Sequence, residues 1–120
     1  MSGPGLKIKI QLYCGDEIAM GPGKADLLDA IASEGSISAA GRKLKMSYRR
    51  CWLLVDVMNR CWSAPLVATS SEGAALTALG IAVLARYRGL QKAVSSTAGR
   101  SQWPDLAREL RGEPLPVQEN

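Results

Sequence analysis

The chain has 120 residues, a mass of 12.8 kDa and 47% hydrophobic residues, enough for one domain with one core and too few for a second full domain. Its net charge of +4 and isoelectric point of about 9.2 favour a polyanionic partner, and no uncharged stretch is long enough to span a bilayer, so we expect a cytoplasmic protein. It has no histidine, and its three cysteines form neither a CxxC pair nor an even set, so we expect no catalytic residue, no metal site and no disulfide framework.

The N-terminal region predicts a β-hairpin. Residues 1–5 are expected to be flexible, and apolar and polar residues then alternate from Leu6 to Cys14. A period of two is typical of a strand with one buried face. Gly15 and Asp16 provide the turn, and residues 17–20 return as a second short strand.

A first helix is expected after this hairpin. The segment GPGK at residues 21–24 leads into it, apolar residues recur at helical spacing, and Gly35 ends it as a C-terminal cap. The glycines do not form a phosphate-binding loop, because their spacing is too short and Ala25 stands where a serine or threonine is needed. We therefore expect no nucleotide at this turn.

Two further helices are expected in residues 35–62, joined by a tight turn. Ser36 caps the second helix, which runs to Leu44, and Gly41 weakens its middle. Lys45 and Met46 form the turn, and the third helix follows over residues 47–62. This is the layout of a helix-turn-helix.

The third helix divides into two faces at 100° per residue. One stripe is apolar and is predicted to face the core, while the opposite stripe carries arginines. The apolar stripe is Tyr48, Cys51, Trp52, Val55, Met58 and Trp62, and the opposite stripe is Arg49, Arg50, Leu53, Val57 and Arg60. Between Arg42 and Arg60 the sequence has six basic residues (Arg42, Lys43, Lys45, Arg49, Arg50, Arg60) against one acidic residue, Asp56.

The C-terminal half predicts a wing and a long helix. Residues 66–69 and 74–76 are expected to pair as strands around the polar tip SSEG. Thr77 then caps a helix over residues 78–94, and its broad apolar stripe predicts a partner. A short helix at residues 104–111 and a disordered tail beyond Gly112 complete the chain.

These elements predict an α+β, mainly helical fold. We expect a winged helix-turn-helix with an N-terminal β-hairpin and a long C-terminal dimerisation helix. Residues 6–95 form the winged-helix domain, residues 1–5 a flexible start and residues 96–120 a partly disordered extension.

A spaced set of short motifs closely resembles the N-terminal DNA-binding domain of ModE-type molybdate-dependent regulators, which is related to the LysR-type winged helix. The set is GSIS, AA, MSY, W, VD, MN and PL, followed by Leu76, Thr77 and Gly80. The resemblance covers roughly residues 5–95. It implies a bacterial-type transcription regulator that binds double-stranded DNA as a homodimer, with contacts between subunits through the first helix and the long final helix.

The resemblance also implies where an effector binds. Regulators of this kind hold molybdate in a C-terminal oxyanion-binding domain, for which this chain has no room. We therefore expect a stand-alone DNA-binding domain with no cofactor and no molybdate sensing of its own.

The candidate site residues follow from this arrangement. A helix in the major groove reads bases with its N-terminal residues, so Arg49 and Arg50 are expected to contact bases, at least one of them a guanine. The other candidate DNA contacts are Ser38, Arg42, Lys45, Ser47, Tyr48 and Arg60, and the candidate dimer contacts are Leu79, Val83, Tyr87 and Leu90. The serines are equally suited to capping alone, and Tyr48 is equally suited to the core.

Two other functions are compatible with the sequence. In the first, the domain is an interaction module that docks a separate effector-binding protein through the broad apolar stripe of the long helix at residues 78–94. An enzyme is the weaker alternative, because the chain has no histidine, metal cluster or nucleophile elbow.

Overall fold

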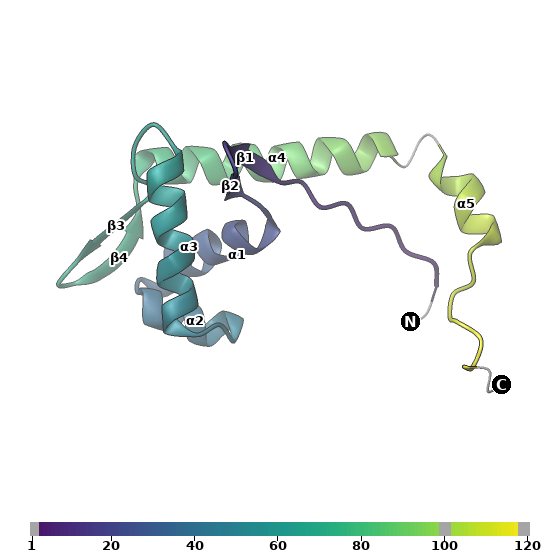
Figure 1. Ribbon diagram of the computed structural model, residues 1–120, viewed down its shortest axis with the longest axis horizontal. Coiled ribbons are helices and arrows are strands. Elements are labelled where there is room, and N and C mark those ends of the chain that lie inside the picture. Colours follow the sequence, from purple (N-terminus) through teal and green to yellow (C-terminus); the bar gives the residue numbers. More distant parts are fainter. Residues whose placement is uncertain (1–2, 99–101, 118–120) are drawn as a thin grey trace. The chain divides into compact units, whose positions relative to one another are not determined.

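The computed structural model describes residues 3–98 and 102–117. A hairpin, three helices, a second hairpin and a long helix follow one another (Figure 1). The chain divides into two compact units: Lys9–Gly89 form the winged-helix unit, and Met1–Ile8 with Leu90–Asn120 form the other. The predicted fold class is confirmed, whereas the domain boundaries at residues 6 and 95 stay a prediction.

The N-terminal hairpin is shorter than predicted. Strand β1 covers only Leu12–Cys14 and pairs antiparallel with β2, Glu17–Met20. The prediction of a strand from Leu6 was wrong, because β2 has only four residues and leaves the residues before Leu12 without a pairing strand. Ile10 and Leu12 nevertheless pack against the core.

Helix α1, Pro22–Glu34, has the predicted limits. Proline stands at the start of the helix, where its missing N–H costs nothing. Gly35 adopts the left-handed conformation with φ 77° and donates its N–H to the carbonyl of Ile31 at 2.9 Å. Leu27, Leu28 and Ile31 are fully buried.

Helices α2, Ile37–Leu44, and α3, Tyr48–Cys61, form the helix-turn-helix. Both predicted caps are present: Ser36 Oγ accepts from Ala39 N and Ser47 Oγ accepts from Arg50 N, each at 3.1 Å. Lys45 is left-handed, with φ 57°, and so makes the sharp turn that usually takes a glycine.

Gly41 has a packing role that the sequence did not reveal. A Cβ atom there would lie 2.8 Å from the carbonyl oxygen of Met46 and 3.0 Å from Cys51 Sγ. The close approach of the turn and of α3 to α2 therefore requires glycine, which explains a residue that weakens the helix itself.

The wing consists of β3, Val67–Ser70, and β4, Gly73–Leu76, as predicted. Near its tip, the wing is joined to the end of α1 by a hydrogen bond from Ala74 N to the carbonyl of Gly35, at 2.9 Å. The side chain of Asn59 joins it to α3: Oδ1 accepts from Leu66 N at 2.9 Å and from Val67 N at 3.0 Å, and Nδ2 donates to the Val67 carbonyl at 3.1 Å.

Helix α4 covers Ala78–Ala98, four residues beyond its predicted end. Thr77 caps it, because its Oγ1 accepts from Gly80 N at 3.0 Å and donates to the Pro65 carbonyl at 2.7 Å. No helix in the described part of the chain is long and apolar enough to cross a membrane.

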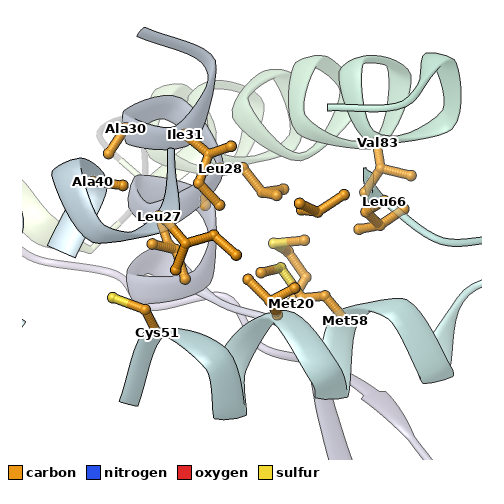
Figure 2. Close-up of a cluster of buried hydrophobic side chains, with 14 of the residues drawn as sticks. Met20, Leu27, Leu28, Ala30, Ile31, Ala40, Cys51, Met58, Leu66 and Val83 are labelled. Atoms are coloured by element: carbon orange, nitrogen blue, oxygen red, sulfur yellow. The ribbon is translucent and has the colours of Figure 1, made fainter. Parts of the chain in front are cut away.

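The core of the winged-helix unit gathers side chains from every helix and from both hairpins. Figure 2 shows Met20, Leu27, Met58, Leu66 and Val83 converging from β2, α1, α3, the segment before β3, and α4. All five are at most 9% exposed.

The C-terminal segment contains the predicted short helix as α5, Trp103–Glu109. Residues 114–117 have neither helix nor strand, which does not test the predicted disorder. The rest of that tail, residues 118–120, and residues 1–2 of the predicted flexible start lie outside the described residues.

Candidate nucleic-acid interface

The face of α3 opposite the core carries Arg49, Leu53 and Arg60. At 100° per residue these three lie about half a turn from Cys51, Val55 and Met58, which are at most 2% exposed. Arg49 is exposed and stands in the first turn of the helix. Arg60 lies at the other end and donates to Asp56 at 2.9 Å, a hydrogen bond that raises its pKa. Arg49 is therefore the cation best placed to enter a major groove.

One flank of α3 faces the wing across a shallow groove of about 170 Å³. Hydroxyl and aromatic side chains dominate its lining: Ser36, Ser38, Tyr48, Trp52, Thr69 and Ser70. The rings of Tyr48 and Trp52 meet edge to face, with centroids 6.1 Å apart. This groove brings together the predicted contacts Ser38 and Tyr48.

The prediction that Trp52 lies in the core was wrong, and so was a core role for Tyr48. Tyr48 is 58% exposed and Trp52 is 37% exposed. Both lie about a quarter turn from the centre of the buried stripe, where the wing covers α3 only in part. Trp62, by contrast, is half-buried and donates from Nε1 to the carbonyl of Ala19 at 3.1 Å.

The other flank of α3 borders a groove of about 340 Å³ with a basic lining. Lys9, Lys24 and Arg50 contribute its charges, and the rest of the lining is Gln11, Ile18, Gly21, Pro22, Gly23, Met46 and Leu54. Burial lowers the pKa of Lys24, and the charge of Arg50 lowers it further. The structure thus separates Arg49 and Arg50, which the sequence had placed on one reading face.

Lys9 and Lys24 were missed by the sequence analysis. The only available signal was Lys24 at the start of a helix, which was considered for a phosphate loop and rejected. Lys9 comes from the segment before β1, so only the packing of the hairpin beside α1 and α3 brings the three cations together.

The remaining predicted DNA contacts have different surroundings. Arg42 and Lys45 are exposed on the helix-turn-helix. Lys43 donates to Ser33 Oγ at 3.1 Å and lies 3.7 Å from the carboxylate of Glu34, so part of the local positive charge is offset. Ser47 is exposed and engaged as the cap of α3.

No protein-family model matches this chain. It is similar to the molybdenum-pterin-binding protein MopB of Rhodobacter capsulatus, with 37% identity over 101 residues that cover 78% of this chain and 37% of that protein. It is also similar to the molybdenum transport protein ModE of Azotobacter vinelandii, with 35% identity over 79 residues, 62% of this chain and 29% of that protein. The chain thus spans about a third of the length of the curated relatives it matches.

Solved structures show the same fold. The complex of the CbnR DNA-binding domain with DNA has a TM-score of 0.57 and 23% identity, covering 68% of this chain and 94% of that chain. Full-length CbnR, a LysR family transcriptional regulator, has a TM-score of 0.53 and 24% identity over 66% of this chain and 27% of that chain. The domain is a ModE-like winged helix.

Several motif residues that carry the ModE-like resemblance have structural roles. Asn59 of the MN pair accepts a hydrogen bond from the backbone N–H of Leu66 in the PL pair, and the Thr77 hydroxyl donates to the carbonyl of Pro65. Gly80 packs so closely on Leu66 that a Cβ atom would overlap its carbonyl oxygen. The spacing of MN, PL and LT-G thus reflects how α3, the wing and α4 meet.

Two of the four predicted dimer contacts were wrong for the ModE-like domain. Val83 and Tyr87 are only 9% and 2% exposed, and Tyr87 donates its hydroxyl to the Ile10 carbonyl at 2.7 Å. Their own chain therefore covers them and leaves no surface for a partner. Leu79 is half-buried and Leu90 is 40% exposed, so these two stay predictions.

The three cysteines differ in exposure: Cys51 is buried, Cys61 is half-buried and Cys14 is exposed. Burial raises the pKa of the Cys61 thiol, and its hydrogen bond with Cys14 raises it further. Among the described residues, no group of three or more acidic or cysteine side chains is arranged to hold a metal ion.

Proposed function

We propose that this chain is a sequence-specific DNA-binding transcription regulator that acts as a dimer and inserts α3 into the major groove. The observation that carries the proposal is the outward face of α3, where Arg49 stands exposed between two grooves that flank the helix. An α-helix with its side chains is about 10–12 Å wide and the major groove about 12 Å, so such a helix fits with its flanks near the backbone phosphates.

The comparisons support the same function. A protein of this fold has been solved with DNA, and one sequence relative is the molybdenum transport protein ModE. Both likenesses fall on the winged-helix region, which contains α3 and its two grooves.

Within this proposal the residues divide their roles. Arg49 grips guanine O6 and N7 with two hydrogen bonds, because it is exposed in the first turn of α3 on the face opposite the core. Ser38 and Tyr48 bind phosphate on the wing side, and Arg42 and Lys45 add attraction that does not depend on sequence. The dimer forms through α4, with Leu79 and Leu90 as the candidate contacts that the core leaves at least partly exposed.

A salt series on DNA tests this function. The specific DNA is a duplex selected from a random library by the protein, and affinity is measured by fluorescence anisotropy from 50 to 200 mM salt. A dimer that neutralises about 6 to 10 phosphates is expected to lose about 10³- to 10⁵-fold in affinity over this range. Absent or salt-insensitive binding refutes the proposal, and a stable protein partner that covers Arg49 would favour the interaction module instead.

Arg49→Ala tests the reading role. It should cost roughly 1 to 3 kcal/mol on the selected duplex and relax the preference at one base pair. The matched control is Lys92→Ala, an exposed cation on α4 outside both grooves and about half a turn from Leu79 and Leu90. Equal losses on all sequences would contradict base reading by Arg49.

A further inference from the structure

The lining of the basic groove beside α3 contains three basic side chains and no acidic one. Lys9, Lys24 and Arg50 come from three segments. Glu17 acts on Lys24 from nearby, but its influence is smaller than that of Arg50. Helix α1 also has no side-chain cap, and the residues at its start, Gly21–Lys24, line this groove.

This arrangement favours an anion. Two like charges held together raise the free energy of the free domain, and an anion between them would lower it. The effect on Lys24 is visible in its pKa, which burial and Arg50 both lower. A bound phosphate group would reverse that influence.

The groove lies on the flank of α3 away from the wing. Arg50 and Leu54 border it, whereas Tyr48 and Trp52 border the groove on the wing side. In the view of Figure 1 the wing is to the left of α3 and α1 is to the right. If α3 occupies the major groove, its two flanks face the phosphates of the two opposite lips.

The wing offers little charge for these phosphates. Its residues 67–76 include Glu72 near the tip and no lysine or arginine. The phosphates on its side therefore meet hydroxyl groups and an acidic tip, and any strong electrostatic contact must come from elsewhere.

We propose that Lys9, Lys24 and Arg50 form a backbone-phosphate site for the lip of the DNA major groove opposite the wing. The proposal rests on the DNA-binding function proposed above and assigns the main part of its salt dependence to this flank. Phosphate contacts position a protein without reading sequence, so the groove sets affinity and orientation while Arg49 sets base preference.

Charge-neutralising variants test the site. We compare Lys9→Gln, Lys24→Gln and the double variant with Lys92→Gln, which removes one exposed charge of α4 outside both grooves and about half a turn from Leu79 and Leu90. Each single variant should reduce the slope of log affinity against log salt by about two, because the dimer loses one phosphate contact in each subunit. The advantage of the wild type over the variant then falls about tenfold between 50 and 200 mM salt.

The base preferences selected from a random library should be unchanged in these variants, and Lys24→Arg should restore the slope. A double variant with the same slope as Lys92→Gln would overturn the site, and so would altered base preference. Saturable binding of inorganic phosphate to the groove that DNA does not displace would assign it to a free anion and also overturn the proposal.

The two proposals fail in different ways. Wild-type protein that shows no salt-dependent DNA binding refutes the regulator itself. If the wild type binds DNA and Arg49→Ala reduces specificity, but the lysine variants leave the salt slope unchanged, only the phosphate site is refuted.

Discussion

Replacing Asn59 by alanine should destabilise the domain more than any nearby surface change. This side chain accepts from the backbone N–H groups of Leu66 and Val67 and donates to the Val67 carbonyl, at 2.9, 3.0 and 3.1 Å. Among the described residues it is the only side chain of α3 that forms a hydrogen bond with β3 or with the residue just before it, and all three bonds are half-buried.

The magnitude follows from these three bonds. A hydrogen bond contributes about 0.5–1.5 kcal/mol net, and leaving a buried partner unsatisfied costs about 1–3 kcal/mol. Water reaches part of this site, so we expect Asn59→Ala to lower the free energy of unfolding by about 2–4 kcal/mol. Asn59→Asp keeps the two acceptor bonds but places a carboxylate oxygen against the Val67 carbonyl oxygen, so it should also destabilise the domain.

Urea unfolding followed by tryptophan fluorescence and by circular dichroism measures these differences. Asp56→Ala is the matched control one turn earlier, because its exposed ion pair with Arg60 contributes at most about 1 kcal/mol. If Asn59→Ala cost no more than this control, the wing would not depend on the side chain of Asn59.

Three further predictions concern packing, thiols and pH. Gly80→Ala should lower the free energy of unfolding by at least about 1–3 kcal/mol, because its Cβ would overlap a backbone carbonyl. Gly89→Ala on the same helix, where a Cβ would meet open space, should raise the free energy of unfolding by up to about 1 kcal/mol. Ellman's reagent should label exposed Cys14 quickly and Cys51 only on unfolding, because burial both shields this thiol and raises its pKa; rapid labelling of both would contradict the core packing. The pKa of Lys24 is lower in the folded domain than its ordinary value of 10.5, so the unfolded chain binds more protons in the alkaline range just below 10.5. Lys24 should therefore make the free energy of unfolding rise with pH in that range. Wild type minus Lys24→Gln isolates this rise in urea titrations, and a difference that falls with pH would contradict the lowered pKa.

Local signals in the sequence were sufficient where one residue determines the backbone around it. The caps at Ser36 and Ser47, the left-handed Gly35 and the cap at Thr77 all appear as predicted. Each depends on a side chain, or its absence, within four residues of the group it serves. Such chemistry can be predicted without knowing the rest of the fold.

Periodicity was sufficient to find helix faces but not to say what covers them. The spacing of α4 correctly put Val83 and Tyr87 on one apolar stripe, yet the cover proved to be the chain's own core and the Ile10 backbone, 77 residues from Tyr87. On α3 the same rule included Trp52, which lies at the edge of the covered stripe. An apolar face predicts contact, and only the tertiary structure decides between self and partner.

The N-terminal and C-terminal halves of α3 contribute differently to the domain. Stability and the proposed reading of DNA therefore depend on different residues. In the C-terminal half, Asn59 bonds to the wing and Trp62 bonds to β2 through the Ala19 carbonyl, so both flanking elements are attached there. In the N-terminal half, Arg49 is exposed. Arg50 donates its backbone N–H to Ser47 Oγ, and its side chain lines the basic groove. Substitutions of the exposed residues in the first half should therefore change affinity and specificity at nearly constant stability, and substitutions of Asn59 and Trp62 should do the reverse. A helix held at one end by hydrogen bonds and presenting cations at the other can exchange its reading residues without losing its fold.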